Sequence, residues 1–196
     1  MFLDRGKSPL FCYYQVMTTA SKNTTKKNNF DIDIRLCRNK DINLLVSEMS
    51  QYGKSRFHIK RLQEQKDGLS DYLIAWHDGK PVGHILISWA GYNVELPSEL
   101  QKVPELNSFE VAEKAQGKAV GYRMIKKAEA LVKKRGFDRV GLLVNPNNKR
   151  AIALYERVGY KDSETGLHLF KWDTIDDHGK ELKGSEKLLA YVKQLA

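Results

Sequence analysis

The stretch Gln116-Gly-Lys-Ala-Val-Gly121 follows a predicted strand and opens a predicted helix. Glycine and alanine at these positions let a ligand approach the backbone closely. The first turn of a helix also presents unpaired N–H groups with a partial positive charge behind them. Together these features favour a site for a phosphate or a pyrophosphate, although a tight turn that binds nothing would have the same sequence. The stretch is neither a Walker loop nor a dinucleotide fingerprint, because it contains neither Gly-Lys-Ser/Thr nor Gly-x-Gly-x-x-Gly.

A second informative stretch lies further along the chain, Asn148-Lys-Arg-Ala-Ile-Ala-Leu-Tyr155-Glu-Arg-Val-Gly159-Tyr160. It predicts a helix after a strand, with Asn148 as its N-cap and Gly159 as its stop. Leu154 and Tyr155 lie on the apolar face of that helix. Each of these residues has a structural role that would explain it without any ligand.

The surrounding sequence predicts a mixed sheet with helices on its faces, an α/β (or α+β) domain. Alternating apolar residues indicate strands, and apolar residues three or four apart indicate helices. A Gly-bearing connection, His77-Asp78-Gly79-Lys80, predicts a hairpin. The predicted strands are Asp31–Cys37, Tyr72–Trp76, Val82–Trp89, Leu106–Val111, Arg139–Val144, Leu167–Trp172 and Leu188–Val192. The predicted helices begin after Asp41 and span Phe57–Gln65, Val120–Arg135 and Arg150–Val158.

The 196 residues fit one domain with an attached extension. Ser21–Asn29 contains no apolar residue, so we expect residues 1–30 to be a flexible N-terminal extension and residues 31–196 to be the folded domain. The cysteines, Cys12 and Cys37, fit a reducing compartment. No apolar run approaches the ~20 residues that span a bilayer, and we expect a cytoplasmic protein with no membrane partner.

The formal charge of +9 permits a nucleic-acid or anionic-ligand partner, but a solubilising surface with a basic tail is the favoured explanation. No block of five like charges occurs, so no nucleic-acid partner is expected. The five histidines have no ligand spacing, so no metal site is expected either.

Taken together, the two stretches resemble the GNAT superfamily of N-acyltransferases. The resemblance rests on Val111, on Gln116-x-x-Ala119-x-Gly121, and on Asn148-x-x-Ala-x-x-Leu-Tyr155-Glu-x-x-Gly-Tyr160. The family prefers glycine where this chain has Ala119. The resemblance implies the GNAT fold, in which a mixed central sheet is splayed between its middle strands and carries helices on both faces.

The resemblance also implies that acetyl-CoA, the cosubstrate, lies in the gap of the splayed sheet. The backbone of Val111 would face the pantetheine and the thioester carbonyl. Asn148 would reach the pantetheine arm, and Lys118 could add a positive charge. The backbone N–H groups that would hold the pyrophosphate belong to Gln116, Gly117, Lys118, Ala119, Val120 and Gly121.

For the chemistry, the resemblance implies direct attack of an amine on the thioester, without a covalent enzyme intermediate. Tyr155 would protonate the departing thiolate, although a tyrosine on an apolar helix face also has a core role. Glu110 and Glu105 are the candidate bases. Simple alternation points their side chains to opposite faces, since five residues separate them. The family bulges this strand, which breaks the alternation, and a water chain or desolvation could replace a base.

The expected function is therefore transfer of an acetyl group from acetyl-CoA to a primary amine of a small molecule or a peptide. The alternative is a catalytically silent protein of the same fold that binds acyl-CoA or a partner protein. Consumption of the thioester with an amine distinguishes the two. The sequence leaves open the identity of the acceptor and whether the chain forms a homodimer, because acceptor loops vary within one fold.

Overall fold

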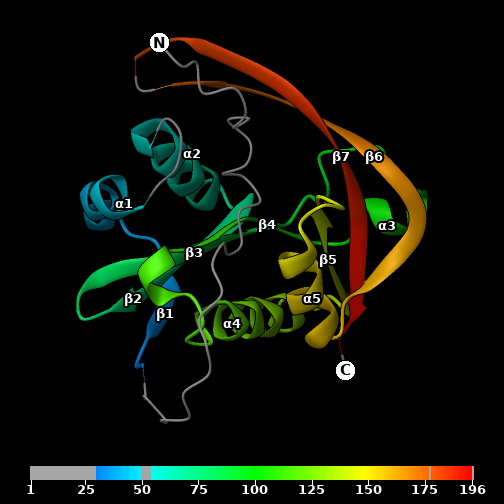
Figure 1. Cartoon of the computed structure of the whole chain (residues 1–196), viewed down its shortest axis with the longest axis horizontal. Coiled ribbons are helices and arrows are strands. Elements are labelled where there is room, and N and C mark those ends of the chain that lie inside the picture. The colour runs from blue at the N-terminus through cyan, green and yellow to red at the C-terminus, as the bar shows by residue number, and fades with distance from the viewer. Residues whose placement is uncertain (1–29, 50–53, 177, 196) are drawn as a thin grey trace, which may run out of the picture.

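The computed structural model describes residues 30–49, 54–176 and 178–195. Its centre is a seven-stranded sheet in the order β1-β2-β3-β4-β5-β7-β6 (Figure 1). All neighbouring strands are antiparallel except β4 and β5, which run parallel. The strands are β1 (Asp33–Leu36), β2 (Ser70–His77), β3 (Lys80–Ser88), β4 (Glu105–Val111), β5 (Arg139–Val144), β6 (Lys161–Ile175) and β7 (Glu181–Gln194).

Helices cover both faces of this sheet (Figure 1). One face carries α1 and α2, whose Leu45, Met49 and Leu62 join an apolar cluster with residues of β2 and β3. The opposite face carries α4 and α5, which build the larger cluster. The helices are α1 (Ile42–Glu48), α2 (Lys54–Lys66), α3 (Ser98–Gln101), α4 (Val120–Lys134) and α5 (Lys149–Arg157), with short 3-10 turns at Asn39–Asp41 and Glu113–Ala115.

The two middle strands separate soon after they meet. Glu105 pairs with Gly141 at the start of β4, and this is the only register pair between β4 and β5. The Gly141 N–H also donates to the Pro104 carbonyl at 2.9 Å. The strands are parallel and their pairing stops near the start of β4, so they diverge toward their carboxyl ends. The predicted splay of the sheet is therefore confirmed.

A β-bulge interrupts β4 at its centre. Leu86 of β3 lies opposite Asn107, and His84 lies opposite Glu110, so two residues of β4 face one residue of β3. Ser108 adopts a left-handed conformation with φ of 49°. An extra residue reverses the alternation of the strand beyond it. This bulge decides which way the chemistry-bearing side chains of β4 point.

Beyond the end of β5, β6 and β7 continue as a curved two-stranded ribbon (Figure 1). The last pair of β5 joins Val144 to Leu189, whereas β6–β7 pairing runs on to Ile175 and Glu181. The sequence predicted much shorter closing strands at Leu167–Trp172 and Leu188–Val192. Those predictions covered only the apolar runs. The remaining ribbon residues are largely polar, and backbone pairing between β6 and β7 holds them in strands.

Other sequence predictions have mixed outcomes. The order of strands and long helices is confirmed, and the hairpin turn has positive φ at both Asp78 and Gly79, as a type I′ turn requires. A helix was predicted to begin after Asp41, with the Asp41 side chain as its N-cap, and this cap is wrong: the carboxylate instead accepts from the Arg38 N–H at 2.8 Å and from the Arg35 guanidinium. Within the predicted extension, only Phe30 is described. The rest of it, with Cys12, lies outside the described residues.

Candidate functional site

The loop before α4 has the backbone shape that an anion site needs. Gly117 has φ of 75° and Ala119 has φ of 60°, both left-handed. A Cβ atom added at Gly117 would meet nothing within 4 Å, so this part of the loop is open. Ala119 is the N-cap of α4 and has no side-chain acceptor for the first-turn N–H groups. These groups, which include those of Val120 and Gly121, are left for a ligand.

The side chain of Gln116 ties this loop to the end of β4. Its Nε2 donates to the Val111 carbonyl at 3.0 Å. The next residue along the strand, Ala112, donates its N–H to Val82 of β3 at 2.9 Å. Because successive N–H groups of a strand point to opposite edges, the N–H of Val111 points away from β3. It therefore faces the gap that β5 leaves when it diverges.

Lys118 lies over an aromatic ring. Its Nζ is 4.2 Å from the ring centroid of Phe30. Arg123, one turn into α4, donates to the carbonyls of Phe30 and Ile32 at 3.0 Å each. These contacts fix the start of the described chain beside the loop, and they direct the Lys118 ammonium to a ring face rather than to the helix N-terminus.

Asn148 has the structural role that the sequence allowed for it. Its Oδ1 accepts from the Ala151 N–H at 3.1 Å, which caps α5. The contact that the family resemblance implies, to a pantetheine arm, stays a prediction.

Tyr155 lies on α5 and is 5% exposed. It belongs to the same apolar cluster as Val111 and Val120, and its ring centroid is 6.0 Å from that of Tyr160. Burial raises the pKa of Tyr155 above its ordinary value of 10, because the phenolate would lose its hydration. A tyrosine hydroxyl is protonated at neutral pH even at its ordinary pKa, and burial makes that of Tyr155 a weaker acid than a solvent-exposed one.

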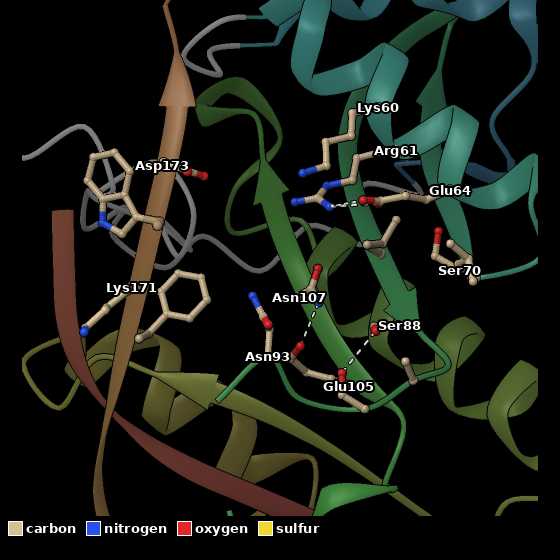
Figure 2. Close-up of a pocket in the computed structure, with 16 residues that line it drawn as sticks. Lys60, Arg61, Glu64, Ser70, Ser88, Asn93, Glu105, Asn107, Lys171 and Asp173 are labelled. Atoms are coloured by element: carbon tan, nitrogen blue, oxygen red, sulfur yellow. Dashed lines mark hydrogen bonds and ion pairs between the residues drawn. The ribbon is translucent and has the colours of Figure 1, made fainter. Parts of the chain in front are cut away.

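A cavity of about 340 Å³ lies on the α2 side of the splayed sheet (Figure 2). Lys60, Arg61 and Glu64 of α2 form one wall, and residues 170–173 of β6 form the other. Glu105 and Asn107 of β4 lie between these walls (Figure 2). Both charged and aromatic side chains line the cavity, and its volume is that of a small-molecule site.

Glu105 is buried, and the carboxylate accepts from Asn107 Nδ2 at 2.8 Å. Ser108 Oγ donates to the other end of that amide at 3.0 Å, which fixes the orientation of Asn107. Burial raises the pKa of Glu105 to about 7, while the Asn107 hydrogen bond and the charge of Arg61 oppose this shift. A carboxyl group with a pKa near 7 can accept a proton at physiological pH.

Glu110 faces the same side of the sheet as Glu105, because the bulge inserts one residue between them. The expectation from simple alternation, that they point to opposite faces, is wrong for this reason. Glu110 Oε2 lies 3.3 Å from Nε2 of the fully buried His84. This contact does not meet hydrogen-bond geometry, and it is an ion pair only when His84 is protonated. Glu110 does not line the cavity that contains Glu105.

Several residues around this site were not predicted as functional. The spacing of the histidines predicted only a surface or core role for His84, because the bulge that brings it to Glu110 leaves no signal in the sequence. Arg61 and Phe170 come from segments far apart in the chain. Within the described ranges, no three His, Cys, Asp or Glu side chains converge to hold a metal ion. None of the described helices is long and apolar enough to cross a membrane.

The fold and site together define an α/β protein with an open, glycine-bearing loop before α4 and a splayed sheet beside it. Comparisons with known proteins agree on its class. The sequence profile of the acetyltransferase (GNAT) family matches residues 42–160. This match covers more than half of the chain. The chain therefore belongs to the GNAT family.

One sequence relative is an uncharacterized N-acetyltransferase of Methanocaldococcus jannaschii, 32% identical over 113 residues. The alignment covers 56% of this chain and 46% of the relative, so it spans about half of that protein. Solved structures share the fold at low identity. A GNAT-family acetyltransferase from Streptococcus pneumoniae has a TM-score of 0.57 at 16% identity, with 84% of this chain and 100% of the other covered.

Two further structures resemble the chain to the same degree. An N-acetyltransferase from Thermoplasma acidophilum, in complex with coenzyme A, has a TM-score of 0.58 at 16% identity, and the alignment covers 84% of this chain and 99% of the other. A ribosomal-protein-alanine N-acetyltransferase from Brucella melitensis has a TM-score of 0.58 at 18% identity, with 83% and 99% covered. These likenesses establish the shared fold.

Proposed function

We propose that this protein is an N-acetyltransferase that transfers an acetyl group from acetyl-CoA to a primary amine. The observation that carries the proposal is the placement of Glu105, with its raised pKa, in a cavity at the point where β4 and β5 separate. Family membership and the coenzyme A complex of one structural neighbour support the choice of cosubstrate.

The residues at the loop fit a coenzyme A molecule. Gly117 leaves room for a close approach, and the first turn of α4 offers N–H groups to a pyrophosphate. Val111 offers its N–H to the gap between the strands, where a thioester carbonyl would lie. When bound, acetyl-CoA supplies an activated acyl group. Lys118 adds positive charge near the loop, and Asn148 holds the start of α5 at the other side of the gap.

Glu105 is the base in this proposal. An ammonium with a pKa near ~10.4 must lose a proton before it can attack a carbonyl. Glu105 is buried, has a pKa of about 7 and lines the cavity. It lies six residues before Val111 on β4, roughly 20 Å along the strand. In this proposal the proton therefore reaches Glu105 through water in the cavity and not by direct contact. Glu110 is less suited, because it is paired with His84 outside the cavity lining.

Tyr155 is the acid in this proposal. Its hydroxyl is protonated at neutral pH and supplies the proton that the departing thiolate takes up. Its raised pKa opposes this transfer, so the role rests on its position on α5 and not on its acidity. The N–H of Val111 stabilises the negative charge that develops on the carbonyl oxygen during attack, because it is fixed in the strand and needs no reorientation. The protein thus uses three fixed groups and forms no covalent bond with the acetyl group.

The acceptor is a primary amine of a small molecule or a peptide. The cavity of about 340 Å³ fits a small amine or the end of a chain, and it has aromatic residues on the ribbon wall and charged residues on α2. One structural neighbour is a ribosomal-protein-alanine N-acetyltransferase, which supports a peptide amine among the acceptors.

The test is acetyl-CoA consumption with a panel of amines: small amines, polyamines, aminoglycosides and peptides with free N-termini or lysines. We expect thioester loss with at least one class and formation of the acetylated amine by mass spectrometry. Binding of CoA without consumption by any of these amines would instead indicate a catalytically silent acyl-CoA-binding protein.

A further inference from the structure

The β4 bulge is clamped by one buried side chain, His84 of β3. His84 is 0% exposed, and its Nδ1 lies 2.7 Å from the carbonyl oxygen of Ser108, the left-handed residue of the bulge. Its Nε2 lies 3.3 Å from Glu110 Oε2, on the far side of the bulge. A single imidazole therefore contacts β4 at the bulge, through Ser108, and directly after it, through Glu110.

The chemistry of these contacts fixes where the protons lie. A carbonyl oxygen only accepts, so Nδ1 must carry a proton and donate it to Ser108. Nε2 lies 3.3 Å from a carboxyl oxygen of Glu110 without forming a hydrogen bond. The directional contact of His84 with β4 is therefore the one to Ser108, and the Glu110 side chain packs against the other nitrogen of the ring.

The bulge that this clamp holds determines the direction of the Val111 N–H. Beyond an inserted residue, every N–H of a strand points to the opposite edge from the one it would otherwise face. The N–H of Val111 faces the gap because Ser108 and Phe109 together oppose Ile85. If β4 slipped into regular pairing, this N–H would turn toward β3.

We propose that His84 is a positioning residue: its contacts with Ser108 and Glu110 hold the β4 bulge that turns the Val111 N–H into the gap between β4 and β5. This inference rests on the proposed function, in which that N–H receives the thioester carbonyl. His84 does not touch the reacting atoms. Neighbouring rings hold the His84 ring in place. The ring centroids of Phe57, His58 and Tyr72 each lie 5.6 Å from that of His84.

The test compares His84→Leu with His58→Leu. His58 of α2 is a matched control, because it is also 0% exposed and its Nδ1 lies 2.8 Å from the Tyr72 hydroxyl of β2. We expect His84→Leu to lower turnover by ~10²-fold, the scale for losing one oxyanion donor, with CoA affinity nearly unchanged. His58→Leu should lower the melting temperature without that loss of turnover. Equal losses of turnover in both variants, or none in His84→Leu, would overturn the inference.

Two conservative variants test the Ser108 and Glu110 contacts one at a time, and they keep the test decisive if His84→Leu does not fold. Asparagine places an amide nitrogen where Nδ1 lies, and glutamine places one where Nε2 lies. We expect His84→Asn, which keeps the donor to Ser108, to retain more turnover than His84→Gln. The reverse order would overturn the clamp at Ser108.

A readout that does not depend on activity completes the test. Backbone amide chemical shifts of Phe109, Glu110 and Val111 should change in His84→Gln and much less in His84→Asn or His58→Leu. Unchanged shifts in His84→Gln would overturn the inference even if the enzyme is active. A wild-type protein that consumes no acetyl-CoA would refute the proposed function, while the amide shifts would still decide whether His84 holds the bulge.

Discussion

Glu105→Gln should remove activity and stabilise the protein at high pH. The carboxyl group is buried, and burial raises its pKa from 4.5 to about 7. Between these two values the unfolded chain loses the proton and the folded chain keeps it. The folded state is therefore progressively disfavoured as pH rises from about 4.5, and the loss is complete above about 7.

The size of the effect follows from the two pKa values. At about 1.4 kcal/mol for each pH unit, the cost to the free energy of unfolding is on the order of 3 kcal/mol above pH 7. Glutamine carries no charge at any pH and can still accept from Asn107. We therefore expect Glu105→Gln to exceed the wild type in stability by up to that amount at pH 9, and by little at pH 4.

The assay has two arms. Urea denaturation at pH 4, 7 and 9 measures the free energy of unfolding, and initial rates across the same range measure kcat/KM. In the wild type, kcat/KM should rise with pH through about 7, as Glu105 becomes a free base. Glu105→Gln should lower kcat/KM by ~10²-fold or more and lose that inflection. Glu99→Gln, at an exposed glutamate on α3, is the control for removal of one charge.

The two arms can refute different parts of the reasoning. A wild-type kcat/KM in Glu105→Gln would remove Glu105 from the role of base. If the stability difference between Glu105→Gln and the wild type were the same at pH 4 and pH 9, the Glu105 carboxyl group would ionise as easily in the folded protein as in water. A stability gain without loss of activity would leave the burial argument intact and return the base to solvent or to Glu110.

Three further predictions test the other parts of the site. Tyr155→Phe should lower turnover by ~10²-fold in single-turnover assays with CoA affinity unchanged, whereas a purely structural hydroxyl would leave turnover as it is. Gly121→Glu should abolish the rise in melting temperature that CoA gives the wild type, because a carboxylate in the first turn of α4 repels a pyrophosphate, and a full shift would refute the loop assignment. Gly141→Ala should lower the free energy of unfolding by about 1–3 kcal/mol in urea, because its Cβ would collide with the buried Tyr92 hydroxyl; equal stability would show that Tyr92 can move away.

The sequence by itself determined the order of the elements and the family. Local signals carry that information: the short apolar run at Arg139–Val144, the helical spacing in α4, and glycines with positive φ at Gly79, Gly117 and Gly159. Each depends on a few neighbouring residues, because backbone conformation and amphipathic faces are local properties. The left-handed turn at Gly117 before α4 follows from the same local signals, and its binding of an anion stays a prediction.

The tertiary structure alone decided how the catalytic candidates divide. Glu105 and Glu110 look alike in the sequence, and only the bulge at Ser108 sets one in the cavity and pairs the other with His84. The length of the β6–β7 ribbon, and the wall it gives the cavity, likewise depend on pairing between residues that are polar and show no strong period. Register and burial arise from contacts between distant segments, and these contacts set the pKa of Glu105.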